Sequence, residues 1–131
     1  MTNKLISALQ LEGAAILTSY TAGTAIPAGN ADRIVVSGRA LTIAGSASTS
    51  AELKLQGSLN GTDGWEDLGV LDLEVATPAV ALNITKATGP DTTKGLACLF
   101  DATMPWVRVA GKWTGGVGLA GESLIASLIL L

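Results

Sequence analysis

The chain contains no histidine and a single cysteine, Cys98. Without histidine, the common general base, the usual catalytic triads and most zinc sites are excluded. One cysteine cannot form an intramolecular disulfide, so the fold is not stabilised by internal disulfides as many small secreted domains are. Cys98 lies in the apolar stretch from Leu96 to Phe100, which favours a buried small hydrophobic residue over a reactive thiol.

Charged and aromatic residues are scarce as well. Charged residues make up 15% of the 131 residues and aromatic residues 4%, whereas hydrophobic residues reach 48% and glycine occurs 16 times. The apolar content is therefore mostly alanine, valine, leucine and isoleucine. Because a surface with so little charge is poorly protected against association, we expect the protein to work in an assembly. The alternative is a monomer with a polar, uncharged surface.

The few basic residues are dispersed. The net charge is −3, and no two lysine or arginine residues are adjacent. Proteins that bind nucleic acids or anionic membranes need a positively charged surface patch, so we expect neither as a partner. The late apolar run from Leu124 to Leu131 is far shorter than the roughly 20 residues of a membrane-spanning helix. Glu12 interrupts the apolar stretch of the N-terminal segment, so we do not expect an export signal there and expect a soluble protein made in a cytoplasm.

What the chain does have is alternation of apolar and polar residues. Leu53 and Leu55 alternate with Lys54 and Gln56, and this period of two marks a strand with one dry and one wet face. The sequence Asn-Gly-Thr-Asp-Gly over residues 60–64 then supplies residues that tolerate positive φ, before a second apolar run begins. We therefore predict a hairpin with strands over 51–59 and 65–76 and a five-residue connection.

Further strands are predicted over 4–11, 32–44, 79–85, 96–100, 106–113 and 122–131, with a loop over 19–30. The apolar residues switch from even-numbered to odd-numbered positions near Gly38 and again near Gly69. A β-bulge would explain each reversal of this alternation. About eight short strands with little helix predict an all-β fold, an antiparallel β-sandwich or jelly-roll-like barrel, as one domain over 1–131. The last strand is apolar on both parities, so it is either central or covered by a partner.

Motifs that could carry catalysis are weak. Gly116, Gly118 and Gly121 match G-x-G-x-x-G, but only ten residues follow, too few for the βαβ unit of a dinucleotide site. The carboxylates near the hairpin favour a solvated face over an acid–base pair or a calcium loop; they are Asp63, Glu66, Asp67, Asp72 and Glu74. We therefore predict that the protein is not an enzyme and has no catalytic residue, metal site or cofactor.

The tryptophans are the best candidates for recognition. Trp106 shares a strand face with Arg108 and Lys112, and an exposed tryptophan beside cations could contact a protein partner or stack on a sugar. A second layer covering Trp106 is the other possibility. Trp65 is expected at the base of the hairpin, and Trp113 in the core.

Two stretches carry a family resemblance. Residues 56–68, with Gln56-Gly57-Ser58 and Trp65 in them, resemble the QGS-x-DG-x-x-W-x-DL hairpin of discoidin-like modules and of small structural proteins of tailed bacteriophages. Residues 105–109, Pro-Trp-Val-Arg-Val, are similar to the P-Y/W-V-R-V strand of the same proteins. Discoidin-type modules are usually larger and closed by a disulfide, so the chain most resembles a phage capsid cement (decoration) protein.

This resemblance implies a non-enzymatic, jelly-roll-like virion protein at the capsid surface, assembled in the host cytoplasm. It further implies self-association, with a trimer favoured, and binding to the major capsid protein or another virion protein. A tail- or fibre-associated role is a variant, and a carbohydrate-binding module that stacks sugar on Trp106 or Trp65 is the alternative. The candidate interface residues come from strand 106–113 and from the first and last strands: Trp106, Arg108, Leu5, Leu9, Ile125, Ile129 and Leu131.

Overall fold

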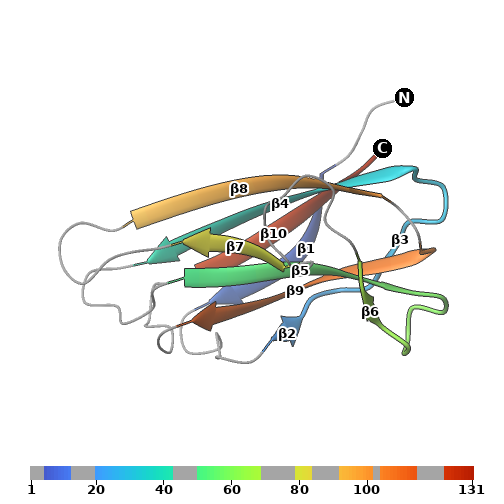
Figure 1. Ribbon diagram of the computed structural model, residues 1–131, viewed down its shortest axis with the longest axis horizontal. Helices are drawn as coiled ribbons and strands as arrows, with labels where there is room; N and C mark the ends of the chain where they lie inside the picture. The colour runs from blue at the N-terminus through green and yellow to red at the C-terminus, as the bar shows by residue number, and fades with distance from the viewer. Residues whose placement is uncertain are drawn as a thin grey trace.

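The computed structural model describes residues 5–12, 20–42, 50–68, 79–83, 92–101, 104–114 and 123–131. Every regular element in these residues is a β-strand. The elements are β1 (Leu5–Glu12), β2 (Thr21–Ala22), β3 (Ile26–Pro27), β4 (Arg33–Thr42), β5 (Ser50–Ser58), β6 (Glu66–Asp67), β7 (Ala79–Asn83), β8 (Thr92–Asp101), β9 (Trp106–Thr114) and β10 (Ser123–Leu130). They form two sheets stacked face to face (Figure 1), which confirms the all-β prediction.

The strands of the first half of the chain pair with those of the second half in reverse order. One sheet, sheet A, has the order β1-β10-β4-β8. The other, sheet B, has β9 and β5 at its centre, with β2 and β3 along the free side of β9 and β6 and β7 along the free side of β5. All of these ladders are antiparallel. A long hairpin rolled into two sheets in this way is a jelly roll, so the predicted architecture is confirmed.

The core lies between the two sheets and follows the period-two pattern of the sequence. Leu53 and Leu55 point inward from β5, and Val107 and Val109 point inward from β9. Sheet A contributes the opposing side chains, of which Ile34, Phe100, Leu124 and Leu128 are fully buried. Alternate residues of each strand therefore enter one continuous apolar layer. Among the described residues, no helix is long and apolar enough to cross a membrane.

β1 contains the bulge that decides which of its leucines enter the core. Its pairing with β10 shifts between Ser7 and Leu9, so Ala8 is the extra residue. An extra residue reverses the alternation of faces. Leu5, before the bulge, is consequently 61% exposed, whereas Leu9, after it, is 4% exposed.

The bulge predicted near Gly38 is wrong. β4 pairs with both β10 and β8 in unbroken register through Gly38. Leu41 therefore lies on the outer face of sheet A, and this placement accounts for the parity reversal that the sequence shows. The second predicted bulge, near Gly69, lies outside the described residues.

The hairpin is confirmed in its first part, because β5 pairs antiparallel with β6. Its connection runs from residue 59 to residue 65 and is longer than the five residues predicted. Most of the expected second strand lies outside the described residues. The stretch 19–30, predicted as a loop, contains the short strands β2 and β3, each of which pairs with two residues of β9.

Candidate functional site

The outer face of sheet B carries a continuous series of interacting polar and aromatic side chains, which we call the polar–aromatic ladder. Its members are Tyr20, Lys54, Gln56, Trp65, Asp67, Arg108 and Lys112. The strand register creates its centre, because Gln56 of β5 pairs with Arg108 of β9 on one side and with Asp67 of β6 on the other. Residues far apart in sequence thus project side by side from one sheet face.

Hydrogen bonds connect the ladder across three strands. Arg108 Nε donates to Gln56 Oε1 at 2.8 Å, and Gln56 Nε2 donates to Asp67 Oδ1 at 3.1 Å. Lys54 Nζ lies 3.2 Å from Asp67 Oδ1 and forms an ion pair with it. The Gln56 amide is therefore held with its oxygen toward the guanidinium and its nitrogen toward the carboxylate.

Cation–π contacts extend the ladder at both ends. The guanidinium carbon of Arg108 lies 4.3 Å from the ring centroid of Trp65. The Nζ atoms of Lys54 and Lys112 lie 4.2 Å and 4.8 Å from the ring centroid of Tyr20. These distances are well within the range at which a cation is attracted to an aromatic face. Two of the few aromatic residues thus hold three of the eight basic residues.

Arg108 is held by both a hydrogen bond and a cation–π contact. Its side chain is half-buried, and partial burial lowers its pKa because desolvation disfavours the charged form. An arginine nevertheless stays protonated, so the site holds a permanent positive charge. Among the described residues, no carboxylate lies within ion-pair distance of this guanidinium.

The β5–β6 connection packs against the indole of Trp106. The connection is organised by Asn60, whose Oδ1 accepts hydrogen bonds from the backbone N–H groups of Thr62 and Asp63 at 2.8 and 3.0 Å. Ser58, fully buried, accepts from the N–H of Gly61 at 3.1 Å. This turn brings Gly61 against the indole of Trp106, which is half-buried. Trp106 is therefore neither fully exposed nor buried beneath a second sheet layer, and its place at an interface stays a prediction.

The two glycines of this connection give a matched test of that contact. Both have positive φ, 75° at Gly61 and 64° at Gly64, so alanine at either position costs about 1–2 kcal/mol of backbone strain. A Cβ at Gly64 meets open space, whereas a Cβ at Gly61 would lie 2.6 Å from Trp106 Cδ2. We expect Gly61→Ala to lower the free energy of unfolding by about 1–3 kcal/mol more than Gly64→Ala in urea titrations. Equal losses would show that the indole moves aside freely.

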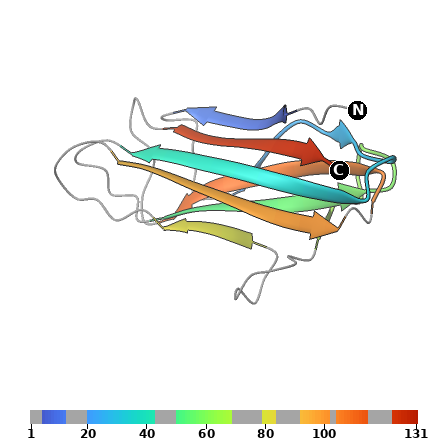
Figure 2. The ribbon, with the colours of Figure 1, turned by 90° about the horizontal axis from the view of Figure 1, so that it is seen from above.

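The outer face of sheet A carries a row of apolar residues across all four strands, which we call the apolar row. The register places Leu5 of β1 opposite Ile129 of β10, Ile129 opposite Val35 of β4, and Val35 opposite Leu99 of β8. Leu5 is largely exposed and the other three are half-buried. Figure 2 looks onto this face, and no described strand crosses in front of it.

The remaining predicted interface residues lie on or near these two faces, with one exception. Ile125 is half-buried on the outer face of sheet A, and Leu131, just beyond β10, is 40% exposed. Leu9 is 4% exposed and packs in the core, so it has almost no surface to offer a partner; the bulge at Ala8 is the reason. The side chain of Trp113 lies outside what the structure describes.

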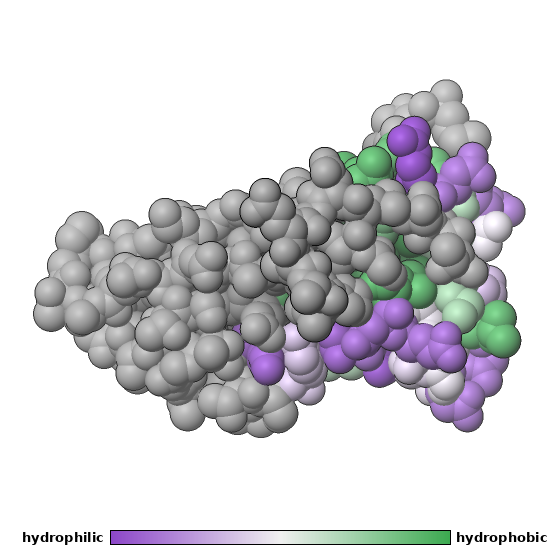
Figure 3. Space-filling view, in the orientation of Figure 1, coloured by the Kyte–Doolittle hydropathy of each residue, from purple (hydrophilic) through white to green (hydrophobic). Residues whose placement is uncertain are grey.

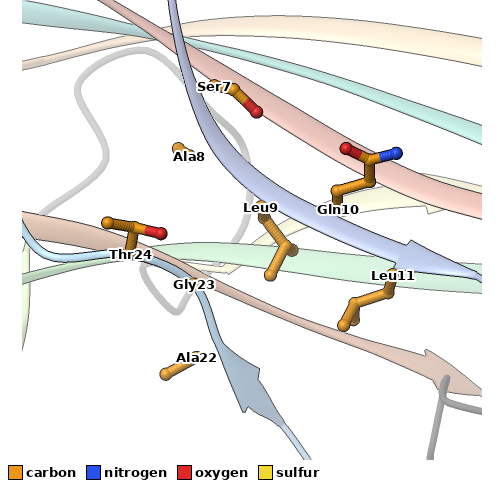
Figure 4. Close-up of a pocket in the computed structure, with 8 residues that line it drawn as sticks. All are labelled: Ser7, Ala8, Leu9, Gln10, Leu11, Ala22, Gly23 and Thr24. Atoms are coloured by element: carbon orange, nitrogen blue, oxygen red, sulfur yellow. The ribbon is translucent and has the colours of Figure 1, made fainter.

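A groove runs along the free edge of β1. It has a volume of about 490 Å³ and lies between β1 and residues 22–24. Leu9 and Leu11 point to one side of β1, and Ser7 and Gln10 point to the other (Figure 4). The described residues of its lining are apolar or carry uncharged polar side chains. Elsewhere, hydrophilic and hydrophobic side chains are intermixed at the end of the molecule that carries β6 (Figure 3).

Sequence reasoning found part of the polar–aromatic ladder. It placed Arg108 and Lys112 on one face of a strand, and period-two alternation places Lys54 and Gln56 on one face as well. It missed Tyr20, because the surrounding stretch has no periodic pattern. It also treated Asp67 as one of several solvated carboxylates, since only the pairing of β6 with β5 brings it to Gln56.

Comparisons with known proteins give the fold and no family. No family model matches the sequence, and no curated protein matches it. Among solved structures, a CBM4 carbohydrate-binding module aligns with 93% of this chain and 70% of its own, with a TM-score of 0.52 and 11% identity. This likeness places the chain among β-sandwich proteins.

Two structures of phage origin overlap more loosely. A chain of the acid-stable capsid of Helicobacter pylori bacteriophage KHP30 aligns with all of this chain and 89% of its own, with a TM-score of 0.47 and 15% identity. The SPBc2 prophage-derived protein YomS aligns with all of this chain and 96% of its own, with a TM-score of 0.41 and 16% identity. Both share β-rich architecture with this chain, and overlaps at that level add no argument about function.

Proposed function

We propose that this chain is a non-enzymatic structural protein of a virion, a capsid cement or decoration protein that self-associates and binds the major capsid lattice. The trimer is the favoured oligomer, and the outer surface of the capsid is the proposed location. The observation that supports the proposal is the apolar row on the outer face of sheet A. The absence of histidine from the whole chain supports a role without catalysis.

The apolar row suits a contact between protein surfaces. It crosses four strands, which at the usual strand spacing makes it about 15 Å long. Next to it, Ser7, Ser127 and Ser37 pair across three strands of the same face. These small side chains leave the sheet flat, so that another surface can approach closely. Such a contact, repeated by symmetry, gains area without needing strong charge pairs.

A charge placed in the apolar row tests the self-association. Ile129→Lys puts an ammonium group in the middle of the row, where the side chain is half-buried but can still extend to water in the monomer. We expect the native chain to sediment as an oligomer and Ile129→Lys to sediment as a monomer with an unchanged circular dichroism spectrum. The matched control is Thr62→Lys, an exposed position in the β5–β6 connection, which should leave the oligomer intact.

Capsid binding needs a separate measurement. The shell to use is assembled from a major capsid protein encoded beside this chain, and co-sedimentation should saturate at a fixed ratio of the two proteins. We expect Ile129→Lys to reduce that ratio and Thr62→Lys to preserve it. A native chain that is monomeric at every concentration and never sediments with shells would remove the proposal.

A further inference from the structure

We propose that the polar–aromatic ladder is a binding site for a carboxylate-bearing saccharide, with Arg108 as the residue that receives the carboxylate. This inference goes beyond the structural role proposed above and does not depend on it, because the ladder lies on sheet B and the apolar row on sheet A.

The guanidinium of Arg108 is held in place, but its two terminal nitrogens have no anionic partner among the described residues. Its Nε atom donates to Gln56 Oε1 at 2.8 Å, and its guanidinium carbon lies 4.3 Å from the centroid of the Trp65 ring. Within the described residues, these are its interactions. A carboxylate is the group that fits the planar fork of a guanidinium, since two parallel hydrogen bonds can form. A ligand carboxylate would supply the counter-charge that the chain itself does not.

The groups beside Arg108 offer both donors and acceptors to a neutral part of the same ligand. Asp67 presents carboxylate oxygens from a side chain that is 41% exposed, and Lys54 presents ammonium protons beside it. A sugar hydroxyl can donate to the first and accept from the second. Trp65 is half-buried on this face, and an aromatic ring is a usual surface for stacking an amphipathic partner.

This combination favours an acidic saccharide over an acidic polypeptide. A glutamate or aspartate side chain offers a carboxylate to Arg108 but no hydroxyl group that could pair with Asp67 or Lys54. A uronic acid carries one carboxylate and several hydroxyl groups on a single ring. Such a ring can offer its carboxylate to the guanidinium of Arg108. Its hydroxyl groups can pair with the amide, carboxylate and ammonium groups that follow along the ladder.

The test uses the full-length chain and a defined probe, hexagalacturonate, in isothermal titration calorimetry. Cellohexaose serves as the neutral saccharide of equal length, and hexaglutamate as the acidic peptide. We expect hexagalacturonate to bind, and cellohexaose and hexaglutamate to bind at least about tenfold more weakly. Arg108→Gln should weaken hexagalacturonate binding about tenfold or more, because it removes a charge-assisted pair of hydrogen bonds.

Two further variants control for charge and for folding. Arg39→Gln makes the same change in net charge at an exposed position on the outer face of sheet A, and it should alter the affinity by less than about twofold. Arg108→Lys keeps the charge but loses the planar fork, and should bind more weakly than the native chain while keeping the native circular dichroism spectrum. The inference fails if hexagalacturonate does not bind, if hexaglutamate binds equally well, or if Arg39→Gln and Arg108→Gln lose equal affinity.

Discussion

Replacing Phe100 by alanine is expected to lower the free energy of unfolding by about 3–5 kcal/mol. Phe100 is fully buried in the core, and it is the one phenylalanine in the chain. It projects inward from β8 opposite Ile34 of β4, into the layer between the two sheets. Among the described residues, the rest of that layer is made of smaller side chains that cannot fill the cavity, so most of the lost contact energy is not recovered.

The neighbouring residue is a matched control for this loss. Leu99 precedes Phe100 on the same strand but points to the outer face of sheet A, where it is half-buried. Leu99→Ala removes less buried area and leaves no enclosed cavity, so we expect a loss of about 1 kcal/mol. Urea titrations followed by circular dichroism, with the same slope for both variants, measure the difference. Similar losses from the two variants would mean that β8 does not sit in the core as described.

Alanine at position 23 is expected to cost about 2–4 kcal/mol, although the change adds only one methyl group. Gly23 lies where the chain passes between the two sheets. Its N–H donates to the carbonyl of Val109 in sheet B at 2.7 Å, and the N–H of the next residue, Thr24, donates to the carbonyl of Ala8 in sheet A at 3.1 Å. A Cβ at position 23 would overlap the backbone oxygen of Ala8 and lie 3.0 Å from that of Val109.

Backbone oxygens cannot turn away as the tip of a side chain can, so the segment itself must shift and one or both hydrogen bonds are lost. The control is Gly29→Ala, where an added Cβ has no neighbour within 4 Å and the loss should stay below about 0.5 kcal/mol. Because the contact involves the bulge in β1, Gly23→Ala should also speed amide exchange in β1 more than in β5. A variant at position 23 as stable as the control would show that β1 is not tied to sheet B there.

Much of the fold follows from local pattern. Alternation in the stretches around Leu53, Ile34 and Val107 marks β5, β4 and β9, and their positions agree with the prediction to within a few residues. Alternation tells which residues share a face, because successive side chains of a strand point to opposite sides. It fails where the backbone adds a residue, as at Ala8, since a bulge leaves no mark in composition. Leu9 was therefore predicted at an interface and lies in the core.

The candidate site was likewise predicted only in part from the sequence. That Trp106, Arg108 and Lys112 lie on one face of a strand is a property of spacing, and it was predicted. The contact that partly buries Trp106 depends on the β5–β6 connection, which folds Gly61 against the indole. No spacing rule brings Tyr20 to Lys54 or Asp67 to Gln56, because those contacts arise from strand pairings between distant segments.

By itself, the amino-acid sequence determined the class of the fold, the identity of most strands and the low charge of the surface, because period-two alternation and composition act locally. Only the tertiary structure decided which sheet each strand joins and which side chains meet across it. The register of β5 with β9 and β6 builds the ladder around Arg108, and the register of β10 with β1 and β4 builds the apolar row. Both depend on pairing over long separations, where every one-residue slip would send each side chain to the opposite face.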